Sequence, residues 1–217
     1  LQSRGLGDVY KRQDPEVYRA MMQEHQKMGR EIVFAGGIWK WTGMGVHYEK
    51  TFQTTFPALQ VCHETGIRHV IATMWGDDGG EVDTYTTLLG MQLYAEFFYH
   101  TAVTMEDLKK QFRRCLGLDM EAFLALQLDE FPSSAKEEKR ESVHTTSKQV
   151  LYQDVLMGLF DKNIQGYGLE EIYQKKREIL SQIQPPVELV PLFAYQNQLL
   201  RVLELKCDLG NQIHEAY

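Results

Sequence analysis

Two short apolar runs limit what this chain can fold into, because each of them leads into tryptophan beside glycine. The first run, residues 31–35, continues through two glycines into the Trp-Lys-Trp stretch at 39–41. The second run, residues 67–74, is rich in β-branched side chains and continues into Trp75. Runs of this length and composition are typical of buried strands. We therefore predict two strands that both end beside aromatic side chains.

Helical patterns alternate with these strands. The Asp-Pro-Glu sequence at 14–16 is a typical helix start, and residues 54–65 and 85–99 carry apolar side chains at helical spacing. The resulting order over residues 14–100, helix–strand–helix–strand–helix, predicts parallel strands joined by crossover helices. Because both strands are apolar along their length, we expect helices or other strands to cover both faces of the sheet.

The second half of the chain has a different pattern. Residues 101–217 contain no alternating pattern typical of strands, and they begin with a capping-box-like sequence at Thr104. Amphipathic spacing predicts helices at 169–183 and 188–217, while 132–146 is polar and charged. We therefore predict an all-α helical domain over 101–217. Its last helical pattern runs to the final residue without a stop signal, so we expect this domain to be truncated at its C-terminus.

The first residues differ in character from the rest. Residues 4–13, RGLGDVYKRQ, resemble the translation of adapter DNA used in sequencing libraries. We therefore expect residues 1–13 to be an artefactual or disordered segment, and we exclude them from the fold.

Composition excludes several classes of function. The net charge is −7 and no block of Lys and Arg is present, so we expect no nucleic-acid partner. No apolar run approaches the roughly 18 residues of a membrane span. The three cysteines are far apart, which favours reduced thiols and a cytoplasmic protein. No close pair of histidines suggests a metal site, and we expect neither a metal nor another cofactor.

The residues after the second strand are the strongest candidates for binding. Trp75 supplies a flat apolar surface, and Asp77 and Asp78 supply carboxylates beside it. Enzymes that bind sugars use this combination, because the ring's C–H surface stacks on an aromatic face and its hydroxyls donate to carboxylates. Trp39 and Trp41 follow the neighbouring strand and are the other candidates. The alternative is that the Trp-Gly step is ordinary core followed by a turn.

Three stretches together resemble a known family. They are IVFAGGIWKWTG, TFPALQVCHETGIRHVIATMWGDDGGE and YAEFFY. They resemble the end of the catalytic barrel of glycoside hydrolase family 20, the β-N-acetylhexosaminidases, and in particular the bacterial branch in which a helical domain follows the barrel. The resemblance implies an α/β fold: residues 14–100 would form the last βα units of a (β/α)8 TIM barrel, followed by the helical domain.

The resemblance also implies roles for the candidate residues. Trp75 would wall the pocket for the N-acetyl group, and Asp77 would accept hydrogen bonds from the 4- and 6-hydroxyls of a terminal N-acetylhexosamine. Asp78 would share that role or bind the backbone of the turn. Trp39 and Trp41 stand where the preceding strand delivers aromatic groups to the same pocket, and the sequence leaves open which of them faces the sugar.

The implied mechanism is substrate-assisted retaining hydrolysis, in which the 2-acetamido oxygen attacks the anomeric carbon. An Asp orients the acetamido group and an adjacent Glu is the general acid. No segment of this chain matches that pair, since Asp129 and Glu130 lie in a helical pattern after the barrel segment. We therefore expect no catalytic residue in this chain and no activity from the chain alone.

Two other interpretations remain open. The helices of 101–217 can form an interaction module that assembles as a homodimer through its apolar faces. Alternatively, the chain belongs to another family of barrel glycosidases in which Asp77 or Asp78 is catalytic. That mechanism requires a second acid roughly 5–9.5 Å away, whereas the neighbouring strand end offers Trp and Lys.

Overall fold

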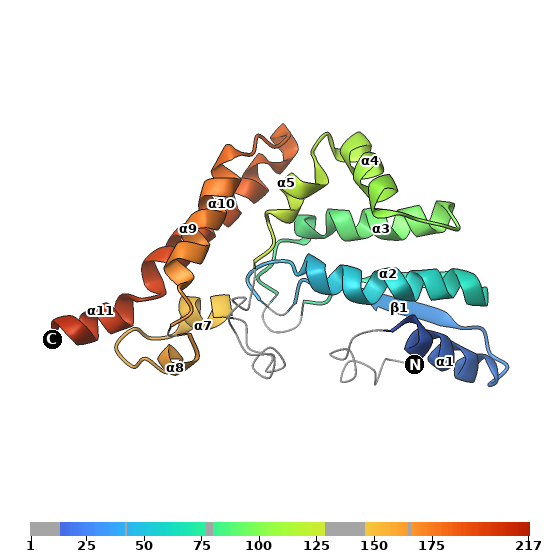
Figure 1. Cartoon of the computed structure of the whole chain (residues 1–217), viewed down its shortest axis with the longest axis horizontal. Coiled ribbons are helices and arrows are strands. Elements are labelled where there is room, and N and C mark those ends of the chain that lie inside the picture. Colours follow the sequence, from blue (N-terminus) through green and yellow to red (C-terminus); the bar gives the residue numbers. More distant parts are fainter. Residues whose placement is uncertain (1–13, 42, 77–79, 129–145, 165) are drawn as a thin grey trace.

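The computed structural model describes residues 14–41, 43–76, 80–128, 146–164 and 166–217. Residues 1–13, including the adapter-like sequence, lie outside this range. The first half contains α1 (Pro15–Gln26), β1 (Val33–Gly37), α2 (Tyr48–Thr65), β2 (His69–Thr73), the 3-10 helix η2 (Thr84–Thr87) and α3 (Leu88–Tyr99) (Figure 1). The second half contains α4 (Met105–Leu116), α5 (Met120–Leu124), α7 (Thr146–Tyr152), α8 (Asp161–Ile164), α9 (Leu169–Gln182), η3 (Val187–Leu189), α10 (Val190–Lys206) and α11 (Leu209–Ala216).

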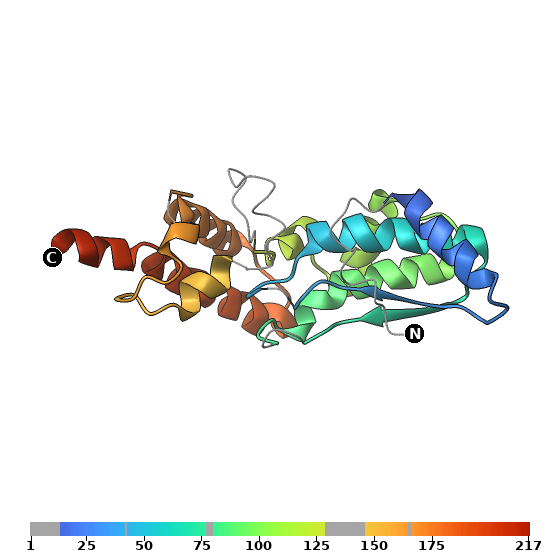
Figure 2. The ribbon, with the colours of Figure 1, turned by 90° about the horizontal axis from the view of Figure 1, so that it is seen from below.

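The strands form a two-stranded parallel sheet, as the alternating order predicts. Val33 pairs with His69 at the start of the strands and Gly37 pairs with Thr73 at their ends. Figure 2 shows the sheet along one side of α1, α2 and α3, with the C-terminal helices beyond one end of this layer. The C-terminal ends of both strands therefore lie at the same edge of the sheet.

The described helices cover one face of the sheet. Phe34 and Val70 point to that face and pack against the hydrophobic core. Side chains alternate between faces along a strand, and on the other face Val33 and Ile71 are each 52% exposed. The prediction that both faces are covered is therefore wrong for the described residues. Apolar composition alone does not distinguish a covered face from a face that lacks its partner.

One hydrophobic core joins the two halves of the chain. It runs from Met44 before α2 to Cys207 at the end of α10 without a break. At its centre the Tyr48 ring of α2 lies 6.3 Å from the Phe123 ring of α5, measured between centroids. The predicted segments 14–100 and 101–217 thus share buried side chains, and the burial of each large side chain contributes about 1.5–3 kcal/mol.

The predicted helix starts agree with the structure where a side chain caps the helix. Asp14 accepts a hydrogen bond from the backbone N–H of Glu16 (2.9 Å). Thr104 and Asp107 form the capping box at the start of α4, with Thr104 Oγ1 accepting from the Asp107 N–H (3.1 Å). These caps act within a few residues, so the sequence is sufficient to recognise them.

Two helix boundaries differ from the sequence prediction. α2 begins at Tyr48, not near residue 54, because the side chain of His47 caps it and Tyr48 packs into the core. The helix predicted over 188–217 is interrupted at Cys207 and Asp208, which separate α10 from α11. None of the described helices combines the length and apolar character needed to span a membrane.

The three thiols differ in accessibility. Cys62 and Cys207 are buried and Cys115 is exposed. Burial raises the pKa of Cys62 to about 12 and that of Cys207 to about 11, so both remain protonated at neutral pH. Since the thiolate is the reactive form, we expect a disulfide-exchange reagent to label Cys115 rapidly, and Cys62 and Cys207 only after denaturation. Rapid labelling of all three in the native protein would contradict the burial of α2 and α10.

Candidate functional site

The candidate residues follow the C-terminal ends of the parallel strands. Trp39 and Trp75 each come two residues after the strand that delivers them, and the strands end at the paired residues Gly37 and Thr73. The backbone N–H of Ile38 continues the ladder by donating to the carbonyl of Thr73 (2.8 Å). The structure therefore brings the two aromatic segments to one edge of the sheet, as the sequence predicts.

The side chain of Trp39 is buried, whereas that of Trp41 packs on its outer side and is only half-buried. Trp39 is only 5% exposed, and its indole N–H donates to Thr54 Oγ1 of α2 (3.3 Å). Trp41 stacks on it with ring centroids 4.5 Å apart and an interplanar angle of 27°. The ammonium group of Lys50 lies 5.5 Å from the centroid of the Trp39 ring. The structure thus gives Trp39 the contacts of a core residue and leaves Trp41 half-buried above it.

Trp41 covers the end of the exposed face of the sheet. A Cβ atom added to Gly37 would lie 2.5 Å from Cη2 of Trp41. By strand alternation, that Cβ would point to the same face as Val33. Glycine at position 37 therefore leaves the space that the Trp41 ring occupies.

We expect Gly37→Ala to displace Trp41 and to destabilise the protein by about 1–3 kcal/mol, the usual cost of overpacking. The tryptophan band of the near-ultraviolet circular dichroism spectrum would lose the contribution of the stacked pair. Gly76→Ala is the matched control, because nothing lies within 4 Å of a Cβ added there. Equal spectra and equal unfolding midpoints for the two variants would contradict the packing of Trp41 on Gly37.

Trp75 leaves the sheet as an accessible side chain. It is 37% exposed, which leaves part of its ring free to meet a ligand. Asp77 and Asp78 lie outside the described residues. The chain is described again from Gly80, whose φ of +66° is a left-handed conformation that favours glycine. We use the name Trp75 turn for the described residues on either side of this gap, Trp75 and Gly76 before it and Gly80 to Asp83 after it.

Lys40 connects the two strand ends. Its side chain, between Trp39 and Trp41 in the sequence, is buried (6% exposed). Its ammonium group donates a hydrogen bond to the carbonyl of Val82 (3.2 Å). A buried charge is costly unless it is hydrogen-bonded, so this contact fixes the segment after β1 to the far end of the Trp75 turn. The sequence does not reveal this role, because the two residues are 42 positions apart.

Glu81 connects the Trp75 turn to the helical half of the chain. Its Oε2 atom lies 3.1 Å from Nζ of Lys148, and its Oε1 atom accepts a hydrogen bond from the Tyr152 hydroxyl (3.3 Å). Both partners belong to α7. On α10, partial burial and the nearby carboxylates of Asp83 and Glu81 raise the pKa of Tyr195. No local pattern in the sequence relates these helical residues to the Trp75 turn, so their role could not be predicted.

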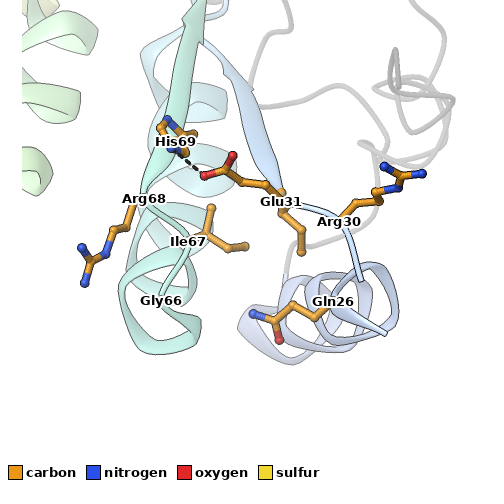
Figure 3. Close-up of a pocket in the computed structure, with 8 residues that line it drawn as sticks. Gln26, Arg30, Glu31, Gly66, Ile67, Arg68 and His69 are labelled. Atoms are coloured by element: carbon orange, nitrogen blue, oxygen red, sulfur yellow. Dashed lines mark ion pairs between the residues drawn. The ribbon is translucent and has the colours of Figure 1, made fainter. Parts of the chain in front are cut away.

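A cavity lies at the opposite end of the strands (Figure 3). It has a volume of about 220 Å³. His69 forms an exposed ion pair with Glu31 (2.8 Å), while the Arg30 and Arg68 side chains point away from one another. The two guanidinium groups therefore do not converge on a ligand. In open parallel α/β sheets, ligands bind beyond the carboxyl ends of the strands, whereas this cavity lies at their amino ends. This cavity is therefore not the candidate site. Its lining consists of Gln26, Arg30, Glu31, Ile32, Gly66, Ile67, Arg68 and His69.

Among the residues that the structure describes, no group of three or more His, Cys, Asp or Glu side chains is placed to hold a metal ion. The described side chains at the strand ends are instead aromatic, with one lysine and one glutamate bound to neighbouring elements. Such an edge can stack against an apolar surface of a ligand.

Comparison with known proteins identifies the helical half. Residues 121–217, from α5 to the end of the chain, match the family model described as Glycoside Hydrolase 20C C-terminal domain. No curated protein matches the chain. The all-α domain predicted after the strands thus corresponds to a domain known from this family. This match supports the identification of the chain with glycoside hydrolase family 20.

Proposed function

We propose that this chain is part of a β-N-acetylhexosaminidase, which removes terminal non-reducing N-acetylglucosamine or N-acetylgalactosamine residues. The observation that carries the proposal is the position of Trp41 and Trp75 at one C-terminal edge of a parallel sheet. The match of the helical half to a glycoside hydrolase 20C domain supports the same conclusion.

In this proposal the Trp75 ring stacks on the sugar and Asp77 accepts hydrogen bonds from its 4- and 6-hydroxyls, with Asp78 as a neighbouring carboxylate. Stacking on an indole contributes on the order of 1–2 kcal/mol. Of Trp39 and Trp41, Trp41 is the one that contacts the ligand in this proposal. Trp39 is covered by the Trp41 ring, and its indole N–H is bonded to Thr54.

The strands β1 and β2 are proposed as the last strands of a (β/α)8 barrel. Three observations support this: the strands are parallel, the described helices cover one face, and apolar side chains remain exposed on the other. In a barrel, that second face points to the interior and is filled by side chains of the other strands. Val33 and Ile71 would be buried there.

The proposed reaction is substrate-assisted, an exception to the scheme with two carboxylates. The acetamido oxygen of the substrate attacks the anomeric carbon, and a glutamic acid protonates the departing oxygen. The Asp-Glu pair required for this step is not matched by any segment of this chain; Asp129 and Glu130 lie outside the described residues. The residues of this chain bind and orient the terminal sugar, and they move no proton in the reaction.

Assay of the purified chain with a chromogenic N-acetylglucosaminide tests this division of roles. We expect no turnover above the uncatalysed rate, because the chain supplies no general acid. In the same preparation, N-acetylglucosamine should change the fluorescence of Trp75, and Trp75→Phe should abolish that change. Robust turnover would show that a catalytic acid lies within this chain and would contradict the assignment.

A second candidate function is assembly with another copy of the chain through the helical half. Leu156, Met157 and Leu159, between α7 and α8, are all strongly exposed, and α11 buries none of its side chains. Exposed apolar groups of this kind are typical of contact surfaces. Light scattering after size exclusion should then give a dimer that the double variant Leu156→Glu, Met157→Glu converts to a monomer. A monomeric wild-type chain would contradict this candidate.

A further inference from the structure

We propose that α7 is a brace for the Trp75 turn, which it holds through Glu81, so that the helical half of the chain sets the affinity of the sugar site. The role in sugar binding rests on the function proposed above, whereas the brace itself does not. Lys148 and Tyr152 are positioning residues in this proposal, because they act through Glu81 and do not touch the sugar.

The carboxylate of Glu81 is held at both of its oxygens. Lys148 approaches Oε2 (3.1 Å), and the Tyr152 hydroxyl donates to Oε1 (3.3 Å). The side chains of Lys148 and Glu81 are only 13% and 21% exposed, so this ion pair is less screened than one on the open surface. A carboxylate bound from two directions has little freedom to rotate.

Glu81 lies next to a residue that another part of the chain also holds. It lies between Gly80 and Val82, and Val82 is buried and accepts the hydrogen bond of Lys40. Two elements from different parts of the sequence therefore fix the same short segment. A Cβ atom added to Gly80 would lie 3.2 Å from the carbonyl oxygen of Gly76, so the two described ends of the Trp75 turn lie side by side. Lys40 and α7 hold the second of these ends.

Helix α7 is itself firmly anchored. Ser147 and Val150 are fully or almost fully buried, and Ser147 Oγ accepts a hydrogen bond from the backbone N–H of Met44 (3.3 Å). Lys206 of α10 donates to the carbonyl of Leu151. A binding residue is placed accurately when its supporting contacts come from a rigid element, and α7 meets this condition.

The titration of the tyrosine agrees with this arrangement. Loss of hydration, followed by the negative charge of Glu81, raises the pKa of the Tyr152 hydroxyl above its ordinary value. Tyr152 therefore keeps its proton at neutral pH and remains a hydrogen-bond donor to the carboxylate.

Fluorine NMR of the full chain labelled with 5-fluorotryptophan tests the brace without requiring catalysis. The chain has three tryptophans, and Trp75→Phe assigns the resonance of interest. In Lys148→Met, we expect this resonance to shift and broaden while those of Trp39 and Trp41 stay in place. Lys148→Arg should restore the wild-type spectrum, because arginine can form the same ion pair. Lys175→Met is the control, since it removes an exposed ion pair with Glu171 (2.7 Å) on α9.

The same samples give the effect on sugar binding, with N-acetylglucosamine as the probe. Apparent affinity falls with the fraction of chains whose site is competent, so we expect Lys148→Met to weaken binding about fivefold to tenfold. Tyr152→Phe removes only one hydrogen bond from an exposed ring and should weaken binding about twofold to threefold. This second variant keeps the test valid if Lys148→Met unfolds the protein.

The outcomes separate the two proposals. If the Trp75 resonance is unchanged in Lys148→Met and Tyr152→Phe, the brace is wrong, even when the wild type binds the sugar. If the resonance moves in these variants but N-acetylglucosamine leaves the wild-type spectrum unchanged, the brace stands and the proposed sugar site is wrong.

Discussion

Asp77→Ala, made in the complete β-N-acetylhexosaminidase that we propose, is expected to lower kcat/KM by about tenfold to a hundredfold. The physical reason is the loss of a charged acceptor opposite a buried sugar hydroxyl, which costs roughly 1.5–3 kcal/mol. Steady-state kinetics with a chromogenic N-acetylglucosaminide measure the effect. Because these hydrogen bonds also form in the bound ground state, KM is expected to rise as well.

Two variants control for indirect effects of this substitution. Asp77→Asn keeps the size of the side chain and removes its charge. It should lower kcat/KM less than Asp77→Ala does. Glu24→Ala removes an exposed carboxylate of α1 that forms a surface ion pair with Lys27. This variant should leave kcat/KM unchanged. If Asp77→Ala has the kinetics of the wild type, Asp77 does not belong to the sugar site.

Phe123→Ala is expected to reduce the free energy of unfolding by about 3–5 kcal/mol, the usual cost of removing a fully buried phenylalanine. Phe123 is completely buried, and its ring lies 5.1 Å from that of Phe112 in α4 and 6.3 Å from that of Tyr48 in α2. Small domains have total stabilities of roughly 5–15 kcal/mol, so this single substitution removes a large share. Urea titration measures the loss.

The same titration tests whether the two halves unfold together. All three tryptophans lie in the first half, so tryptophan fluorescence reports on that half. Far-ultraviolet circular dichroism also reports on the helices of the second half. Because one core joins the halves, fluorescence and circular dichroism should give coincident transitions. Phe98→Ala on the exposed side of α3 is the control and should cost less than about 0.5 kcal/mol. Separate transitions would contradict the shared core.

The sequence was sufficient to predict features that depend on neighbouring residues. The caps at Asp14 and Thr104 act within one helical turn, and both are present in the structure. The alternation of helices and strands predicted the parallel pairing, and this pairing alone brings Trp39 and Trp75 to one edge. The position of the candidate site therefore followed from local patterns together with a general rule of chain topology.

Features that depend on distant contacts could not be predicted. The start of α2 depends on the local cap of His47 and also on the packing of Tyr48 against Phe123 of α5, far along the chain. The exposure of Val33 and Ile71 depends on which elements are present to cover the sheet, and apolar composition does not report this. The contacts of Glu81 with Lys148 and Tyr152 join residues about 70 positions apart, which leave no periodic signal in the sequence.

The choice between Trp39 and Trp41 illustrates the same limit within one short loop. The two side chains are identical and stand two residues apart, so composition and spacing treat them alike. The structure distinguishes them through partners on α2: Thr54 binds the indole N–H of Trp39, while Trp41 stacks above it and covers the end of the exposed sheet face. Trp41 is therefore the one carried into the proposed pocket.

A crystal structure of the chain with N-acetylglucosamine would decide whether an indole and a carboxylate bind the terminal sugar together. We predict a sugar ring stacked on Trp75, with hydroxyls donating to Asp77, at the edge of the sheet that Trp41 covers. A sugar bound elsewhere, or Trp75 and Asp77 facing away from Trp41, would contradict the proposed site.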